Sequence, residues 1–359
     1  MKKNETKHEI IENHFIDLIK NKKINIGDQL PSENEIASYF NVSRHTVRQA
    51  LSKLSEHGLI VKEKGKGTFC IDNFEKEEKA SKNIALLTTY ISNYIFPKIT
   101  EGVEEVLRQK GYNLLLFNSN NDIENEINCL KSIENQDISG VIIEPAQSSI
   151  NNLDKKYFQE FDKKNIKYIM INAYYEELNP AYLVLNDEQG GYRLTKYLIE
   201  LGHKNIAAIL KKDDIQGQKR KKGYIKALEE NEVKIDETII GEYTTDTKEM
   251  SIKEFLRSIL KMQSRPSAIF CYNDEVALKC IEILRKDGIK VPEDISIVGF
   301  DDSSLATASE VKLTSIIHPK KQMGIQAAKY IIGMVEGKLK KPRYVYDAEL
   351  IVRDSCTKK

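Results

Sequence analysis

Residues 30–69 read LPSENEIASYFNVSRHTVRQALSKLSEHGLIVKEKGKGTF, and they contain the signals that predict the fold of the N-terminal part of the chain. Ser32 and Glu35 match the S-x-x-E capping box, which predicts a helix that begins at Glu33. The dipeptide Asn41-Val42 ends that helix, and Ser43 can cap a second one over residues 44–56. The second helix is predicted to be amphipathic, because its apolar residues recur at helical spacing: Val47, Ala50, Leu51 and Leu54.

The flanking segments complete a winged helix-turn-helix. The apolar stripe of residues 7–20 predicts a helix before the quoted stretch. After Gly58, the run LIVKEKGKGTFCI at residues 59–71 predicts two short strands around a Gly-Lys-Gly turn. Three helices, with a tight turn between the second and the third, and then a hairpin form the winged helix-turn-helix arrangement.

Positive charge is concentrated in this region, although the whole chain has a net charge of only +1. Residues 43–67 carry six Lys or Arg against two Glu, which is a local charge of +4. The start of a helix presents free N–H groups that suit phosphate, and arginine also reads guanine in the major groove. A solvated helix face is the alternative, and for Gln49 and Ser52 it explains the sequence equally well. The coincidence of a capped helix, a polar outer face and a basic turn favours DNA.

The same stretch resembles the GntR class of bacterial winged-helix repressors, over about residues 5–72. The resemblance implies that the residue after the Pro-Ser pair, the start of the third helix and the hairpin turn contact operator DNA. Glu33 could accept a hydrogen bond from a cytosine amino group, or it could simply be favoured by the helix dipole. With Lys7 added as a phosphate contact on the first helix, the predicted DNA-binding residues are Lys7, Glu33, Arg44, His45, Thr46, Arg48, Lys64, Gly65 and Lys66.

A change in composition marks the end of this unit. The stretch DNFEKEEKASKN at residues 72–83 is charged and has no apolar periodicity. Such a composition is typical of a linker, which is predicted over residues 73–82. It separates a DNA-binding domain over residues 1–72 from a larger domain over residues 83–359.

Apolar runs and amphipathic helices alternate in the larger domain, which predicts βαβ units and buried parallel sheets. The domain is too long for a single sheet of this kind, so two lobes with a cleft between them are expected. The predicted strands lie within residues 84–90, 112–119, 140–145, 167–172, 182–187, 205–212, 267–274 and 295–302, and helical segments lie at 96–111, 190–203, 217–232 and 275–288.

Polar and aromatic residues follow many of these predicted strands. Ligands of open α/β sheets bind at the carboxyl ends of strands. Carboxylates, amides and arginine bond hydroxyl groups, and aromatic rings cover the apolar face of a sugar. A helix cap is the alternative for Asn273-Asp274 and for Asp301-Asp302. Several such clusters at one sheet edge favour a site for a polyhydroxylated ligand.

The larger domain resembles the LacI/GalR type of sugar-responsive effector domain, which is similar to periplasmic sugar-binding proteins of type I. The motifs are GQKRKKGY at residues 217–224, AIFCYNDEVALK at 268–279, VPEDISIVGFDDSSLA at 291–306 and LTSIIHPKKQMGIQAAKYI at 313–331. Arg220 is expected near the start of a helix, where its guanidinium can bond two hydroxyls, and His318 is expected where the chain crosses between lobes. The implied ligand contacts are Tyr90, Tyr94, Phe96, Glu144, Asn172, Lys211, Asp213, Arg220, Asn273, Asp301 and His318.

A GntR-like reader joined to a LacI-like sensor resembles the family of arabinose-responsive repressors of Gram-positive bacteria, as does the stretch LTTYISNYIFPKI at residues 87–99. This resemblance implies a homodimer, a pseudo-palindromic operator and L-arabinose as the effector. The residue types fit many polar ligands, so a regulator that senses a different sugar or a nucleoside is an open alternative.

The sequence lacks the motifs and segments that would indicate several other classes of protein. Five scattered cysteines without a C-x-x-C motif fit reduced thiols rather than a disulfide framework or a zinc site. No G-x-G-x-x-G, P-loop, G-x-S-x-G or H-E-x-x-H motif occurs, and no aminotransferase-like lysine site is evident, so no enzyme, cofactor or metal is expected. The N-terminus lacks the apolar core of a signal peptide, and no apolar run approaches 20 residues. These features predict a cytoplasmic regulator rather than a transport protein or a membrane protein.

Overall fold

The computed structural model describes residues 6–21, 23–63, 65–71, 81–148 and 155–359. The chain forms two compact units, Met1–Ala80 and Ser81–Lys359, and each is described by itself. Most of the predicted linker over residues 73–82 lies outside the described residues, as does Lys64. Among the described helices, none is long and apolar enough to cross a membrane.

The first unit is a winged helix-turn-helix, as predicted. Local caps determine where its helices begin, because the Ser32 hydroxyl accepts from the Glu35 N–H at 3.3 Å and the Ser43 hydroxyl accepts from the Thr46 N–H at 3.2 Å. Ile11, Ile36 and Val47 pack in one core between the helices. The described elements are α1 (Lys7–Lys20), α2 (Glu33–Phe40), α3 (Arg44–Glu56) and the antiparallel hairpin of β1 (Ile60–Glu63) and β2 (Gly67–Cys70).

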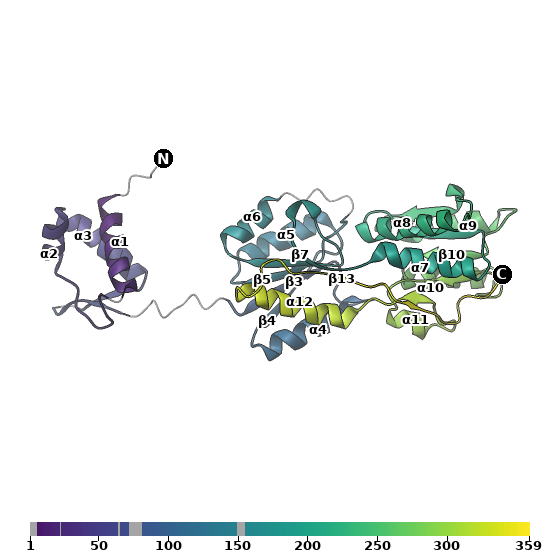
Figure 1. Ribbon diagram of the computed structural model, residues 1–359. Helices are drawn as coiled ribbons and strands as arrows, with labels where there is room; N and C mark the ends of the chain where they lie inside the picture. Colours follow the sequence, from purple (N-terminus) through teal and green to yellow (C-terminus); the bar gives the residue numbers. More distant parts are fainter. Residues whose placement is uncertain (1–5, 22, 64, 72–80, 149–154) are drawn as a thin grey trace. The chain divides into compact units, whose positions relative to one another are not determined.

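The second unit has the two predicted lobes (Figure 1). Over the described residues, the first lobe is a parallel six-stranded sheet in the order β13-β7-β6-β5-β3-β4, with α4 and α12 on one face and α5 and α6 on the other. Its strands are β3 (Asn83–Thr88), β4 (Asn113–Asn118), β5 (Gly140–Ile143), β6 (Lys167–Ile171), β7 (Ala181–Leu185) and β13 (Arg343–Tyr346). Its helices are α4 (Phe96–Gln109), α5 (Ile123–Glu134), α6 (Lys156–Lys163) and α12 (Lys320–Val335).

The second lobe is built, over the described residues, on a parallel four-stranded sheet in the order β11-β10-β8-β9. Helices α7 and α8 cover one face, and α9 and α10 cover the other. Its elements are α7 (Asp187–Glu200), β8 (Ile206–Lys211), α8 (Ile215–Glu230), β9 (Ile240–Tyr243), α9 (Lys248–Leu260), β10 (Ala268–Cys271), α10 (Asp274–Lys286), β11 (Ser296–Val298) and α11 (Ser304–Ala308).

The described chain passes between the lobes three times: from β7 into α7, from β12 (Ser315–Ile316) into α12, and from β13 into β14 (Leu350–Ile351). The last of these passages is the thin yellow segment that joins the lobes in Figure 1. Parallel strands place their carboxyl ends at one edge of each sheet, so the strand ends of both lobes can face the same cleft.

A buried carboxyl group lies in the first lobe between α5 and the loop after β5. Glu126 accepts hydrogen bonds from the Ala146 N–H at 2.8 Å and from the Tyr175 hydroxyl at 2.9 Å. Its side chain is fully buried. Burial outweighs these hydrogen bonds and raises the pKa of Glu126 to about 7.

This pKa predicts a pH dependence of stability. The folded protein binds the Glu126 proton more tightly than the unfolded chain does, so the stabilisation is fully present below about pH 4.5 and is lost as the pH rises to about 7. In Glu126→Gln, we expect the free energy of unfolding to fall less between pH 5 and pH 8 than in the wild type, by up to about 3 kcal/mol. Urea unfolding of both proteins at several pH values measures the difference, and equal pH profiles would contradict the assignment.

Candidate functional site

A cavity of about 250 Å³ lies between the two lobes of the second unit. Its walls come from the carboxyl ends of strands and the loops that follow them in both lobes. The structure brings ten of the eleven predicted ligand contacts together here: Tyr90, Tyr94, Phe96, Glu144, Asn172, Lys211, Arg220, Asn273, Asp301 and His318. Asp213 is the exception, because its carboxylate is buried against the backbone N–H and hydroxyl of Thr245 and does not line the cavity.

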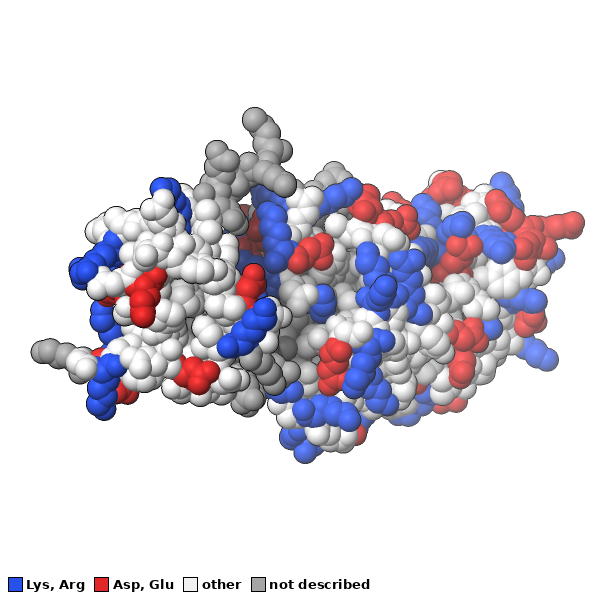
Figure 2. Space-filling model, turned by 60° about the vertical axis from the view of Figure 1, so that its left-hand side comes forward, with Lys and Arg blue, Asp and Glu red and all other residues white. Residues whose placement is uncertain are grey.

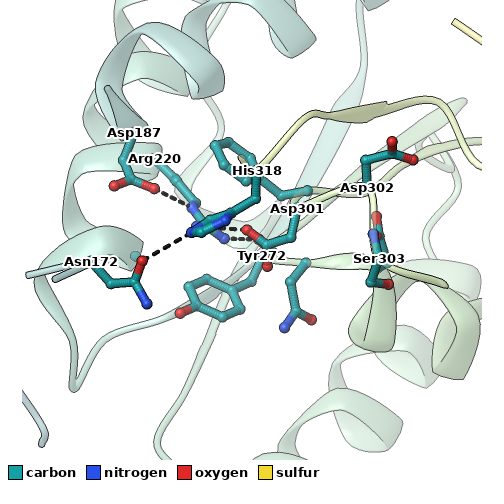
Figure 3. A network of polar contacts seen from close by, with 12 residues as sticks. Asn172, Asp187, Arg220, Tyr272, Asp301, Asp302, Ser303 and His318 are labelled. Atoms are coloured by element: carbon teal, nitrogen blue, oxygen red, sulfur yellow. Dashed lines mark hydrogen bonds and ion pairs between the residues drawn. The ribbon is translucent and has the colours of Figure 1, made fainter. Parts of the chain in front are cut away.

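Arg220 is the centre of the polar network in this cavity (Figure 3). Its Nε donates to Asp187 Oδ1 at 2.8 Å, and its Nη2 donates to Asp301 Oδ1 at 3.2 Å. Its Nη1 donates to the carbonyl oxygen of Tyr272 at 2.7 Å. The guanidinium carbon also lies 3.6 Å from the ring centroid of Phe300. Only 4% of Arg220 is exposed, so this cation is held in place by its partners rather than by water.

The electrostatics of this cluster keep Arg220 charged. Burial disfavours the cation, but the carboxylates of Asp301 and Asp187 raise the pKa of Arg220 above its ordinary value. Burial raises the pKa of Asp187 to about 6, which leaves its carboxyl group ionised at neutral pH. The site therefore presents a fixed cation between two carboxylates, which suits a neutral ligand with several hydroxyl groups.

Close helix packing puts Arg220 beside Asp187. A Cβ atom at Gly191 would lie 2.3 Å from the carbonyl oxygen of Arg220, and one at Gly223 would lie 2.0 Å from that of Glu188. Glycine at both positions lets α7 and α8 approach to backbone contact. Helix α8 begins at Ile215, with Asp214 as its cap, so Arg220 lies in the second turn rather than at the helix start that we predicted.

A second chain of hydrogen bonds runs through the first lobe to the crossing before α12. Glu144 accepts from the Thr89 hydroxyl at 2.7 Å and from Asn172 Nδ2 at 2.7 Å. Because that bond fixes the amide, Asn172 Oδ1 is the acceptor for His318 Nε2 at 2.9 Å (Figure 3). The proton of a neutral His318 therefore sits on Nε2.

The other ring nitrogen of His318 is a buried acceptor. Nδ1 is buried and has no hydrogen-bond partner among the described groups. Burial lowers the pKa of His318 to about 4, so the ring is neutral at physiological pH. His318 therefore contributes a neutral ring to the cavity wall.

The loop after β3 reaches across the cavity. The Tyr94 hydroxyl donates to Asp301 Oδ2 at 2.7 Å, which joins the first lobe to the second. Tyr90 and Phe96 pack with ring centroids 5.8 Å apart and supply the aromatic part of the wall. Asn273 caps α10 through the Val276 N–H and also lines the cavity, so its two predicted roles are compatible.

Sequence reasoning missed several residues of the cavity wall. Asp187 is the last residue of the predicted strand segment at residues 182–187 and matches the strand-end signal that identified the others. Tyr272 and Asp214 adjoin predicted contacts, and the Tyr272 hydroxyl donates to Asp214 Oδ2 at 2.7 Å. Further lining residues are Thr89, Asn93, Asn121, Gln216, Tyr243, Thr245, Lys248 and Glu275. Within the described parts of the chain, no cluster of His, Cys, Asp and Glu could hold a metal ion.

The first unit carries a separate candidate surface on α3 and the hairpin. Glu33 Oε2 lies 2.8 Å from Arg48 Nε, and Glu33 Oε1 lies 2.7 Å from Lys62 Nζ. Glu33 therefore connects α3 with the wing, an arrangement that we did not predict. The bonds from Lys62 and Arg48 lower the pKa of Glu33.

The other predicted DNA contacts are mostly exposed. Lys7, Arg44, His45, Gly65 and Lys66 are exposed, whereas Thr46 is half-buried and its hydroxyl lies 2.9 Å from that of Ser43. Gln29 Nε2 donates to the carbonyl oxygen of Lys66 at 2.9 Å and steadies the tip of the hairpin. Basic and acidic side chains are interspersed over the face of the molecule in Figure 2, in keeping with the net charge of +1.

Comparisons with known proteins agree with this architecture. Residues 7–70 match the gntR family of bacterial regulatory proteins, and residues 195–356 match a periplasmic binding protein-like domain. The chain is 43% identical over 362 residues to an arabinose metabolism transcriptional repressor of Halalkalibacterium halodurans, across 98% of this chain and 96% of that protein. It is 46% identical over 332 residues to a protein of the same description from Geobacillus stearothermophilus, across 91% of each.

Solved structures share the fold. A complex of the transcriptional regulator CelR with cellobiose matches with a TM-score of 0.67 and 24% identity, across 91% of this chain and 100% of that chain. A LacI family regulator from Enterococcus faecium with bound ribose matches with a TM-score of 0.68 and 22% identity, across 77% of this chain and 99% of that chain.

Proposed function

Because this chain belongs to the family of arabinose metabolism transcriptional repressors, we propose that it represses genes of L-arabinose use in the cytoplasm and leaves its operator when the sugar fills the interlobe cleft. It is a DNA-binding regulator with a gntR-type reader and a periplasmic-binding-like domain. Its relatives are transcriptional repressors and not enzymes.

The interlobe cavity is the observation that best supports a sugar as the ligand, because polar groups from both lobes converge on it. The guanidinium of Arg220 has five N–H donors, of which three are bonded to groups that the structure describes, so two can bond ligand hydroxyls. The neutral ring of His318 also lines the cavity. A ligand that touches both lobes binds the closed form more tightly and shifts the population toward closure.

Isothermal titration calorimetry with L-arabinose, D-xylose, D-ribose, D-galactose and adenosine tests this assignment. We expect L-arabinose to bind most tightly and to release operator DNA in a gel-shift titration. By linkage, operator DNA must then weaken sugar binding by the same factor that sugar weakens DNA binding. Release by another of these ligands, and not by L-arabinose, would refute the effector while leaving the repressor intact.

For the DNA, we propose that Arg44, His45, Thr46 and Arg48 contact bases or phosphates from α3, and that Gly65 and Lys66 contact the backbone from the wing. Lys64 is proposed as a further wing contact and Lys7 as a phosphate contact. For Glu33, the ion pairs with Arg48 and Lys62 support a role in orienting these cations as well as the proposed DNA contact.

We also propose a homodimer on a pseudo-palindromic operator, because a two-fold protein matches a two-fold site. Strand β4 supports this proposal: it is an edge strand of sequence NLLLFN, and Leu116 on it is 43% exposed. An exposed apolar edge strand tends to pair with another chain unless another surface covers it. We expect analytical ultracentrifugation to show a dimer for the wild type and a shift toward monomer for Leu116→Glu.

Met250→Glu is the control for the dimer, because Met250 is an exposed apolar residue of α9 in the other lobe. We expect that variant to remain dimeric. A wild type that is monomeric both with and without DNA would contradict the proposal.

A further inference from the structure

A chain of hydrogen bonds beside the cavity links the two lobes through side chains. Asn121, between β4 and α5 in the first lobe, donates from Nδ2 to Thr245 Oγ1 at 2.7 Å. Thr245, after β9 in the second lobe, lies with Oγ1 2.6 Å from Asp213 Oδ2. The backbone N–H of Thr245 donates to the same carboxylate oxygen at 2.8 Å. The first of these bonds exists only when the lobes are close together.

Neighbouring hydrogen bonds determine which group is the donor and which is the acceptor at each step of this hydrogen-bond chain. Asn121 Oδ1 accepts from the Gln147 N–H at 3.0 Å, and the Asn121 carbonyl oxygen accepts from Gln147 Nε2 at 3.0 Å. These bonds hold the Asn121 amide with its nitrogen toward the second lobe. A carboxylate can only accept, so the Thr245 hydroxyl gives its single proton to Asp213 and keeps a lone pair for Asn121.

Hydrogen bonds within its own lobe thus orient each side of the interlobe bond. With the lobes together, Asp213 and Asn121 are 2% and 4% exposed. Asp213 does not line the cavity, and its carboxylate instead fixes the loop after β9. In a further interlobe bond, the Ser148 hydroxyl accepts from the Ile215 N–H at 3.0 Å, at the start of the helix that carries Arg220.

We propose that Asp213 is a positioning residue for lobe closure, which orients the Thr245 hydroxyl to accept the hydrogen bond from Asn121. A contact made only in the closed form raises the affinity for a ligand that prefers that form. Asp213 thus increases effector affinity through Thr245, without a contact of its own to the ligand. This inference rests on the proposed function, in which ligand binding and closure are coupled.

A pair of variants at Thr245 tests the hydroxyl itself. Thr245→Val removes the hydroxyl at nearly constant volume, whereas Thr245→Ser keeps it. We expect L-arabinose to bind Thr245→Val about two- to tenfold more weakly in calorimetry, which corresponds to the loss of one neutral hydrogen bond. We expect Thr245→Ser to bind the sugar more tightly than Thr245→Val, because it keeps the hydroxyl group. Wild-type sugar affinity in Thr245→Val, or equal losses in both variants, would overturn the proposal.

A double-mutant cycle separates this relay from direct ligand contacts, since Thr245 and Asn121 also line the cavity. If the two residues act through one bond, Asn121→Ala combined with Thr245→Val weakens binding no more than the larger single change does. Additive losses would mean that each residue touches the ligand separately, and would overturn the relay. Asp213→Ala reports on the orienting carboxylate, and unchanged affinity in that variant would also overturn it.

A measurement without ligand distinguishes failure of the relay from failure of the proposed function. Spin labels at Lys131→Cys on α5 and Lys253→Cys on α9, in a background in which the native cysteines are replaced by serine or alanine, report the distance between the lobes by pulsed electron resonance. We expect a longer mean distance in sugar-free Thr245→Val than in the wild type and in Thr245→Ser. If the wild type binds none of the sugars, the effector assignment fails, but this distance still decides the relay: equal distances overturn it.

Discussion

Arg220→Ala is expected to bind operator DNA with wild-type affinity and to ignore the effector sugar. Arg220 and its three hydrogen-bond partners all lie in the unit Ser81–Lys359, separate from the DNA-binding unit. Losing two charge-assisted hydrogen bonds to ligand hydroxyls reduces sugar affinity by about a hundredfold or more. Calorimetry with L-arabinose and gel-shift titration with and without the sugar measure the two effects separately.

Arg220→Ala is also expected to destabilise the protein, so its stability must be measured together with its sugar affinity. Without the guanidinium, Asp187 and Asp301 are left as buried carboxylates without their cation, which destabilises a fold by about 3–5 kcal/mol. Arg220→Lys keeps a cation and loses the planar fork, so we expect a stabler protein that still lacks the sugar response.

The control lies on the same pair of helices. Lys222 Nζ is 2.8 Å from Glu188 Oε2, in an exposed ion pair between α8 and α7. Lys222→Ala therefore removes an ion pair between the same helices without touching the cavity, and we expect a normal sugar response. If Arg220→Ala is released from DNA at the wild-type sugar concentration, Arg220 is not part of the effector site.

Arg48→Ala is expected to lower operator affinity by about a hundredfold or more while sugar affinity remains normal. A lost base contact costs about 1–3 kcal/mol, and a dimer on a pseudo-palindrome loses one in each half-site. The side chain of Arg48 is 66% exposed on α3, so its removal leaves the core of the DNA-binding unit intact. Gel-shift titration gives the operator affinity, and calorimetry gives the sugar affinity.

Arg285→Ala serves as the matched control for Arg48→Ala. Its side chain is 71% exposed on α10, and its Nη1 lies 3.9 Å from Glu310. It thus removes an equally exposed arginine from the other unit. Unchanged operator affinity in Arg48→Ala, or an equal loss in Arg285→Ala, would show that Arg48 makes no specific contact with the operator.

The parts of the fold that local chemistry determines could be predicted closely from the sequence. Ser32 and Ser43 cap α2 and α3 through bonds within three residues, so the bounds of these helices were predicted correctly. The buried central strands were found because they are continuous apolar runs. The edge strands β9 and β13 were missed: β13 is only four residues long, its Tyr344 and Val345 are largely exposed, and it pairs with β7 more than 150 residues earlier.

At the candidate site, the features that the sequence did not predict also depend on contacts between residues far apart in the chain. Asp213 and Asp214 are neighbours in the sequence, yet only Asp214 lines the cavity. The carboxylate of Asp213 instead accepts a hydrogen bond from the backbone N–H of Thr245, in the loop after β9. Nothing local distinguishes the two residues. The bond between Glu33 and Lys62 joins positions 29 residues apart, and it depends on how the wing folds back on α2.

Glu33 also has a consequence for the thermodynamics of DNA binding. By bonding Arg48 and Lys62, it acts as a built-in counterion for two of the cations on the DNA-reading surface. Phosphates that approach these cations displace a carboxylate that stays attached to the protein, whereas salt ions displaced from the DNA disperse into solution. The unbound protein therefore presents a weaker positive field to arbitrary DNA than its lysines and arginines suggest, which limits retention on sequences that offer phosphates alone.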